Sequence, residues 1–182
     1  MNDMILERRR NTPFFIFPAL EATGLVHHGF SVRDGGVSTG PFASMNLSFT
    51  MGDDRENVLE NYHRMAKGLG VETAGMTSVF QAHTDKVVMA GRGDAGKGIL
   101  LPKDPEEVDG MVTNCPGLTL VTLHADCLPL FFLDPVNRAI GLTHSGWRGT
   151  QKARFSASRL GGRGVSPTRR RGVCGNRKLF VI

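Results

Sequence analysis

Three side chains that can bind a metal ion or attack a substrate stand at the ends of apolar runs: His83, Cys127 and His144. Two imidazoles and one thiolate form a ligand set that zinc accepts, with a fourth position left for water or substrate. The same groups could instead act as a thiolate nucleophile with imidazole partners. Because each apolar run predicts a strand that ends at the residue in question, both chemistries place the functional site where strands give way to loops.

The other histidines and cysteines give weaker signals. His124 lies three residues before Cys127. If the segment between them is extended, their side chains point to opposite faces, because side chains alternate along a strand. His124 therefore ranks behind the other three. An unpaired cysteine is most often a buried small apolar residue, and nothing around Cys115 or Cys174 indicates more. A single histidine in a loop is more often a surface residue, so His83 has the weakest local pattern of the trio.

Two arginines stand where they could bind an anion. Arg148 lies between Gly146 and Gly149, and a guanidinium there could hold a phosphate through two N–H groups. Arg33 precedes the glycine pair at 35–36, whose backbone N–H groups could add further donors. The alternative is that both arginines are solvated residues of turns. Together with an open metal position, they would suit a substrate that carries phosphate or another anionic group.

The elements that must position these residues indicate a mixed α/β domain with a large sheet component. A helix is predicted to begin near Asp53-Asp54, whose carboxylates suit a helix N-terminus, and to end at 68–70. Turn residues at 134–137 predict a hairpin between the last two strands. The near-continuous apolar runs 118–123 and 128–133 predict strands that are buried on both faces. The predicted strands are 27–33, 78–81, 87–90, 109–113, 118–123, 128–133 and 139–143.

The size and composition suit a cytoplasmic enzyme. The 182 residues suit one domain that can bury a core without disulfide bonds. No apolar stretch approaches the roughly 18 to 20 residues of a membrane helix, and the N-terminus does not resemble an export signal. We therefore expect a cytoplasmic protein with reduced thiols and no membrane partner.

The net charge of +5 comes from the last part of the chain. Residues 1–150 hold 13 Lys and Arg against 17 Asp and Glu, a net charge of −4, whereas residues 151–182 hold nine Lys and Arg and no acid. A basic tail can bind nucleic acid, but no aromatic stacking pattern and no recognised binding motif accompanies this one. We therefore expect no nucleic-acid partner. The sequence predicts one domain over 1–150 and a basic tail over 151–182 that is poorly ordered or packs non-natively.

Read together, the motifs resemble one family, the laccase-domain or multicopper polyphenol oxidase family, whose members are regarded as purine nucleoside phosphorylases. The resemblance covers roughly residues 24–150. Its most specific parts are Ala-Asp-Cys-Leu-Pro at 125–129 and His-Ser-Gly-Trp-Arg-Gly at 144–149. The other matching segments are 29–38, 41–47, 52–54, Asn57 with Asn61, 81–83 and 109–113.

The resemblance implies a metal site made by His83, Cys127 and His144, with zinc as the usual metal and copper also claimed for the family. It implies phosphorolysis of adenosine, inosine, guanosine and methylthioadenosine, with adenosine deamination as a side activity. The partners would be a purine nucleoside and phosphate. Arg33 and Arg148 would bind the phosphate, and Asn46 would hydrogen-bond the ribose. The implied fold is a layered α/β/β/α arrangement, similar to the catalytic domain of the bacterial cytotoxic necrotizing factors and incomplete here at the C-terminus.

The end of the chain departs from the family pattern. Family members continue after Gly-Trp-Arg-Gly with a helix and an Ile-Gly-Pro-type segment, and residues 151–182 match neither. An acid-free tail joined to a good motif is typical of a truncated or frameshifted gene product.

Several copper centres need many histidines. The chain has six, which suffice for one mononuclear site. Two alternatives to a metal-dependent phosphorylase stay open. One is a metal-free hydrolase or deamidase with Cys127 as nucleophile and His144 as base. The other is an inactive remnant that binds a metal or a partner.

Overall fold

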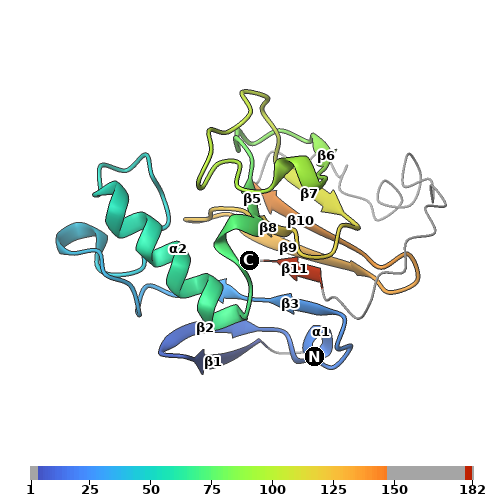
Figure 1. The fold of residues 1–182 in the computed structure, drawn as a ribbon, viewed down its shortest axis with the longest axis horizontal. Coiled ribbons are helices and arrows are strands. Elements are labelled where there is room, and N and C mark those ends of the chain that lie inside the picture. Colours follow the sequence, from blue (N-terminus) through green and yellow to red (C-terminus); the bar gives the residue numbers. More distant parts are fainter. Residues whose placement is uncertain (1–3, 147–178, 182) are drawn as a thin grey trace.

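The computed structural model describes residues 4–146 and 179–181, which form three sheets beside one long helix (Figure 1). That helix, α2 (Arg55–Leu69), begins and ends where the sequence predicts. The Asp54 carboxylate caps its N-terminus by accepting a hydrogen bond from the backbone N–H of Glu56 at 2.8 Å. Gly70 ends it in the left-handed conformation, with φ of 72°. The buried face of α2 carries Val58, Asn61, Tyr62, Met65, Ala66, Gly68 and Leu69.

The first sheet packs against this helix and was not predicted. It has the order β1-β2-β4, with β1 (Ile5–Arg9), β2 (Thr12–Ile16) and β4 (Phe30–Ser31). No strand before residue 27 was predicted from the sequence. The β1–β2 turn consists of Arg10 and Asn11, both at positive φ (50° and 67°), as two-residue hairpin turns require. Arginine is an unusual residue there, so the turn has no strong signature in the sequence.

The second sheet contains only parallel pairs and has the order β3-β11-β8-β5. Its third strand, β8 (Thr119–Val121), is buried on both faces, as predicted for the run 118–123. Leu120 joins one core cluster and Val121 the other. The remaining strands are β3 (Val26–His28), β5 (Met76–Ser78) and β11 (Leu179–Val181).

Strand β11 belongs to the basic tail, and the backbone of 179–181 pairs with both β3 and β8. The rest of the tail, at 151–178 and 182, lies outside the described residues.

The third sheet carries two of the three candidate ligands. Its order is β6-β7-β10-β9, and the predicted hairpin is confirmed as the antiparallel pair β9 and β10. The prediction that 128–133 is buried on both faces is wrong, because these residues are mostly half-buried. Among the described strands, β9 is at the edge of its sheet and pairs only with β10. The strands are β6 (Val87–Met89), β7 (Gly110–Thr113), β9 (Leu128–Asp134) and β10 (Ala139–Ser145).

Three predicted strands end at least two residues earlier than expected, among them 118–123, which ends with β8 at Val121. The predicted strand 27–33 is divided at Gly29 into β3 and β4, which belong to different sheets. A Cβ at Gly29 would lie 2.8 Å from the Leu69 side chain and 3.1 Å from Phe14, so the chain crosses there between tightly packed elements. The predicted strand 78–81 ends with β5 at Ser78. The short helical elements are α1 (Pro18–Glu21), η1 (Gly40–Phe42), η2 (Thr73–Gly75) and η3 (Arg92–Asp94).

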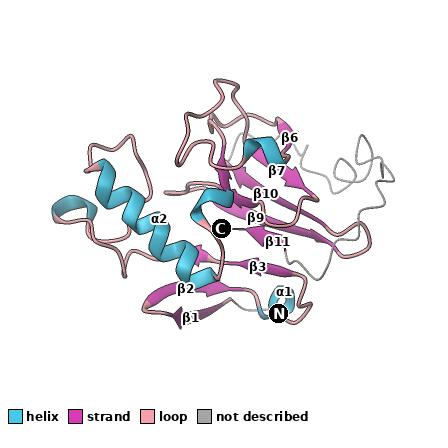
Figure 2. Cartoon of the chain, in the orientation of Figure 1, coloured by secondary structure: helices cyan, strands magenta, loops and turns pink. Residues whose placement is uncertain are grey.

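Two apolar clusters join these layers. The helices and strands together confirm the predicted mixed α/β class (Figure 2). One cluster lies between α2, β2 and the second sheet, and includes Phe14, Met65 and Val121. The other lies between the second and third sheets, and includes Leu120 and Leu142. The likeness to the necrotizing-factor domain stays a prediction. In the part of the chain that the structure describes, no helix has the length and apolar character that crossing a bilayer needs.

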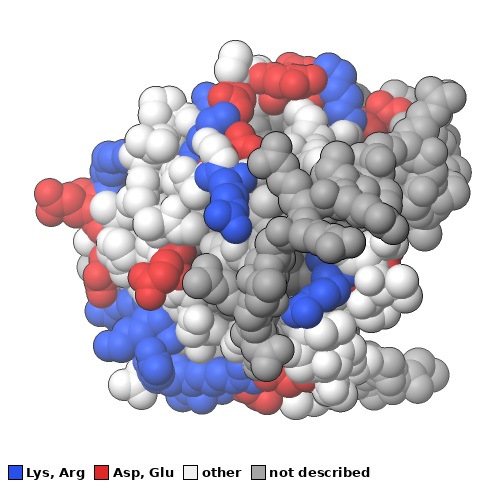
Figure 3. Space-filling view, turned by 45° about the vertical axis from the view of Figure 1, so that its right-hand side comes forward, with Lys and Arg blue, Asp and Glu red and all other residues white. Residues whose placement is uncertain are grey.

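Charged groups tie the N-terminal hairpin to α1. The Arg9 guanidinium donates hydrogen bonds to Glu7 at 2.7 Å and to Glu21 at 2.9 Å. These pairs are partly exposed, so each contributes at most about 1 kcal/mol. On the face drawn in Figure 3, basic side chains gather along the lower edge and acidic ones near the top.

A buried histidine lies close to this ion network. His28 is 1% exposed, and its Nε2 accepts a hydrogen bond from the backbone N–H of Phe17 at 2.7 Å. Its Nδ1 lies 3.9 Å from a Glu21 carboxylate oxygen. Burial lowers the pKa of His28, and the Glu21 carboxylate only partly opposes this effect. The neutral ring is therefore the form that the fold favours.

We predict that His28 makes the fold sensitive to acid. Because its pKa is lower in the folded state, the unfolded chain binds more protons, and stability falls as the pH drops below about 6.5. Urea unfolding at pH 7.5 and pH 5.5 should show a smaller loss on acidification for His28→Gln than for the wild type. The difference cannot exceed about 1.4 kcal/mol per pH unit, which is the limit for one proton. The exposed His63, replaced in His63→Gln, is the matched control; equal losses in the wild type and His28→Gln would contradict the prediction.

Candidate metal centre

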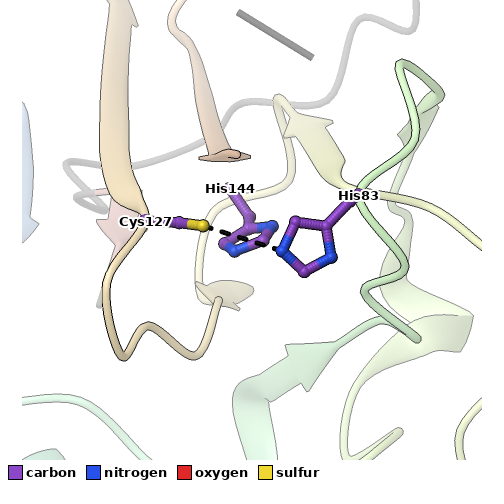
Figure 4. A group of neighbouring side chains, drawn as sticks. All are labelled: His83, Cys127 and His144. Atoms are coloured by element: carbon purple, nitrogen blue, oxygen red, sulfur yellow. Dashed lines mark hydrogen bonds between the residues drawn. The ribbon is translucent and has the colours of Figure 1, made fainter. Parts of the chain in front are cut away.

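The structure brings together the three side chains that the sequence singles out. One ligand atom from each of His83, Cys127 and His144 lies within 4.8 Å of the other two. The Cys127 Sγ is 3.7 Å from the Nε2 of His83. The two imidazole rings have centroids 4.9 Å apart and planes at 75°. Figure 4 shows the thiol and both rings pointing toward one another from separate segments.

The β9–β10 hairpin positions two of the three groups. Cys127 immediately precedes β9, and His144 lies near the end of β10. In this antiparallel pair His144 is opposite Pro129 and Ser145 is opposite Leu128, so the thiol and the imidazole meet at the same end of the hairpin. Pro129 has no backbone N–H to donate, which is tolerated on a strand at a sheet edge.

The third group, His83, comes from the loop between β5 and β6. Its backbone is in the left-handed region, with φ of 59°. Gln81 fastens this loop to the segment that leads to Cys127: its side-chain amide donates to the Leu123 carbonyl and accepts from the Leu123 N–H, both at 2.8 Å. Gly146 leaves room for the ring, because a Cβ there would lie 2.6 Å from the Cδ2 of His83.

The carboxylate of Asp109 connects both histidines. Asp109 is fully buried, and its Oδ1 lies 2.7 Å from the Nδ1 of His144. Its Oδ2 accepts hydrogen bonds from the backbone N–H groups of Ala82 and Thr84, on either side of His83. A carboxylate on one ring nitrogen leaves the other ring nitrogen as the electron-pair donor and fixes the ring orientation. Asp109 therefore orients His144 and holds the His83 loop.

No role in the site was predicted for Asp109 from the sequence. Its one signal is an acidic residue at the start of the buried strand β7, which runs Gly-Met-Val-Thr. An acid that enters a buried strand needs a partner, and that partner comes from β10, 35 residues later.

His124 lies nearer to the site than the extended geometry implied. The segment before β9 bends, and the His124 ring is 5.2 Å from the ring of His144. Both of its nitrogens are occupied: Nδ1 is 3.1 Å from the Cys127 carbonyl and Nε2 is 2.8 Å from the Thr122 hydroxyl. Burial, together with His144, lowers the pKa of His124 to about 4. His124 thus supports the loop of Cys127 and is not part of the ligand group.

Arg33 and Asn46 lie in the loop that precedes α2, and neither lines the cavity beside the trio. Arg33 is exposed, and its Nε donates to the Ala43 carbonyl at 2.6 Å. The Asn46 amide donates to Asp53 at 3.0 Å and accepts from the Ser48 N–H at 3.0 Å. Both residues therefore organise the loop in this structure. Arg148, with Trp147, lies outside the described residues.

A buried asparagine of α2 fixes the same loop. The amide of Asn61 donates to the Ser38 hydroxyl and to the carbonyls of Ser44 and Asn46, and it accepts from the Val37 N–H. Asn61 thus holds residues 37–46 of the loop against α2.

A cavity of about 570 Å³ adjoins His83 and His144. This is within the range of about 300 to 1,000 Å³ that is usual for small-molecule sites. Apolar side chains form most of its wall, including Phe49, Phe80 and Leu101. Two of the three side chains, His83 and His144, therefore border a space that can hold a molecule larger than water.

The donors suit a single metal ion. Two imidazoles and a thiolate match the sites of zinc and equally those of copper, and the buried carboxylate on His144 is a usual support for a metal-binding histidine. All six histidines are described, and within 4–146 and 179–181 the trio is the one group of three or more His, Cys, Asp or Glu side chains able to hold an ion.

We predict that Asp109→Asn weakens zinc binding by about 10- to 100-fold, the usual effect of losing a carboxylate that supports a ligand histidine. Competition with a chromophoric chelator measures the zinc Kd. Asp134→Asn, at the opposite end of β9 from Cys127, makes the same chemical change away from the site and should leave the Kd unchanged. An Asp109→Asn protein that binds zinc like the wild type would exclude an orienting role for this carboxylate.

A second prediction tests the position of the His83 ring. The Cβ of Gly146→Ala would overlap the ring, so the ring must move, and zinc binding should weaken by about tenfold or more. The matched control is Gly93→Ala, because Gly93 has no positive φ and no heavy atom within 4 Å of an added Cβ. Unchanged zinc affinity in Gly146→Ala would show that His83 tolerates displacement.

Comparisons with known proteins agree with this architecture. The family model described as multi-copper polyphenol oxidoreductase laccase matches residues 27–159. The chain is 39% identical over 126 residues to purine nucleoside phosphorylase LACC1 of Mus musculus, covering 68% of this chain and 27% of that protein. It is 39% identical over 134 residues to a purine nucleoside phosphorylase of Deinococcus radiodurans, covering 73% of this chain and 49% of that protein.

A solved structure shares the fold. The crystal structure of YlmD from Geobacillus stearothermophilus matches with a TM-score of 0.74 and 30% identity, over 87% of this chain and 57% of that chain. The present chain spans about a quarter to a half of the length of the two phosphorylases above. The matched residues include the whole ligand trio. The chain belongs to the multi-copper polyphenol oxidoreductase laccase family.

Proposed function

We propose that this protein is a purine nucleoside phosphorylase that depends on a zinc ion held by His83, Cys127 and His144. The observation that carries the proposal is the convergence of these side chains beside a cavity of about 570 Å³. The names of the related proteins point to the same reaction. Because the chain spans at most about half of those proteins, its activity and substrates are proposals.

The reaction replaces the bond between the base and ribose C1′ by a bond from C1′ to a phosphate oxygen, and the departing base nitrogen takes up a proton. A bound divalent ion would supply Lewis acidity toward an oxygen of phosphate or water; copper is the alternative metal. The protein itself would position the metal ligands and exclude water from the reacting bond. Asp109 fixes the orientation of His144, Gln81 fastens the His83 loop, and the apolar wall of the cavity shields the bond that breaks.

The finer expectations from the family resemblance are part of this proposal. The substrates would be adenosine, inosine, guanosine and methylthioadenosine, with adenosine deamination as a side reaction. Phosphate binding by Arg33 and Arg148, ribose binding by Asn46, a cytoplasmic location and the absence of nucleic-acid partners stay predictions. The domain boundary at 150 is also untested.

A metal-free cysteine hydrolase or deamidase is the second candidate. It is favoured by the separation of 3.7 Å between the Cys127 Sγ and the His83 Nε2, a distance at which a thiol and an imidazole can share a proton. His144, the base expected from the sequence, has its Nδ1 against Asp109, which leaves its Nε2 as the electron-pair donor. An inactive metal-binding remnant is the third candidate.

Phosphorolysis of inosine, followed by base release with and without a chelator, separates the three candidates. We expect turnover that requires phosphate, is abolished by the chelator, and returns when zinc is added. Cys127→Ser should lose at least about 100-fold in kcat/KM, because it removes one of three ligands. The matched control is Cys115→Ser, at a half-buried cysteine outside the ligand trio. Base release that persists in the chelator and does not require phosphate would favour the cysteine hydrolase, and no turnover under any condition would favour the remnant.

A further inference from the structure

We propose that Lys103 and Arg55 form a subsite for a phosphate group in the cavity beside the ligand trio. This inference rests on the proposed function and adds to it the residues that receive the anion. Both side chains line the same cavity as His83 and His144. They come from different walls: Arg55 opens α2, and Lys103 lies in the loop between η3 and β7.

The charged side chains that line the cavity, apart from the histidines, are all positive. Within the described part of the chain, no Asp or Glu lines this cavity, and neither Arg55 nor Lys103 has an ion-pair partner. Arg55 is exposed, whereas Lys103 is half-buried, so for Lys103 the partial withdrawal from water without a counter-ion costs free energy. An anionic ligand would remove that cost, whereas a neutral nucleoside would not.

Lys103 is the better placed of the two cations. It is half-buried, and burial lowers the pKa of its ammonium group. The other charged lysine of this loop region, Lys97, differs in that it pairs with Asp94 and Asp104, each at 2.8 Å. Lys103 therefore has no ion-pair partner among the described residues, and a bound anion would supply one.

Arg55 is held at the wall by stacking. Its guanidinium carbon lies 4.8 Å from the centre of the Phe49 ring. Phe49 in turn stacks on Tyr62, with centroids 5.6 Å apart and planes at 14°. The contact with an aromatic face fixes a guanidinium while its N–H groups stay available for hydrogen bonds. Because one face of Phe49 packs on Tyr62, the ring itself has little surface left for a purine base.

A neutral donor accompanies the two cations. Tyr62 is 1% exposed and lines the cavity, and its hydroxyl has no hydrogen-bond partner among the described residues. Burial raises the pKa of Tyr62, so the hydroxyl keeps its proton and can donate it in a hydrogen bond. Two cations and one O–H donor suit the several acceptor oxygens of a phosphate group.

Two molecules could bring such a group: inorganic phosphate, or a nucleoside that carries a 5′-phosphate. Isothermal titration with inorganic phosphate and with inosine 5′-monophosphate, at constant ionic strength, distinguishes them. For Lys103→Met we expect the Kd of one or both ligands to rise by about tenfold or more, as for the loss of a charged hydrogen bond. Lys103→Arg keeps the charge and should stay close to the wild type. Arg55→Met should weaken the same ligand.

The matched control is Lys67→Met, at an exposed lysine of α2 that does not line the cavity, and it should bind both ligands like the wild type. If Lys103→Met and Arg55→Met both leave the two Kd values within twofold of the wild type, the subsite is refuted. Because binding is measured without turnover, the experiment can refute the phosphate subsite and the proposed phosphorylase function independently. Phosphate binding that depends on Lys103 in a protein without phosphorolysis would refute the function alone. Phosphorolysis with an unchanged phosphate KM in Lys103→Met would refute the subsite alone.

Discussion

The contact between the Asp109 carboxylate and the His144 ring determines the geometry of the candidate metal centre. One oxygen of Asp109 faces the imidazole, and the other binds the backbone on both sides of His83. Burying a carboxylate is costly unless its oxygens are hydrogen-bonded, and here the residues that satisfy it are those that carry two of the three ligands. The same interaction therefore stabilises the fold and sets the orientation of the site.

Local patterns account for what the sequence could predict. The helix at 55–69 has a carboxylate cap, an apolar stripe and a terminal glycine, all within the 17 residues from Asp54 to Gly70. The hairpin of β9 and β10 has residues that are typical of turns. The Asp134 carboxylate accepts hydrogen bonds from the backbone N–H groups of Val136 and Asn137. Because Cys127 and His144 flank this hairpin, their approach follows from local structure. The prediction that His83 lies beside them came from the metal-binding chemistry of its side chain and from the family resemblance.

Tertiary contacts account for what the sequence could not predict. The role of Asp109 depends on a partner 35 residues away, and the burial of β9 depends on its place at a sheet edge. Arg10 has no turn signature, yet it adopts the left-handed conformation because the β1–β2 pairing requires it. Arg55 and Lys103 are far apart in the sequence, and no local pattern connects them. Only the three-dimensional structure shows that both line the same cavity. The contacts of Arg33 Nε with the Ala43 carbonyl and of the Asn46 amide with Asp53 likewise depend on how the loop before α2 folds.

The β9–β10 ladder links the ligand pair to a distant tight turn. The ladder begins at Asp134 and Ala139 and runs without interruption to Leu128 and Ser145, so a change in the length of the 135–138 connection would shift every pairing. Since strand side chains alternate, a slip of one position would turn the His144 imidazole away from the sulfur without altering either residue. Insertions or deletions in a surface-exposed connection, about 20 Å away at a rise of about 3.3 Å per residue, can thus abolish ion coordination as completely as replacing a ligand.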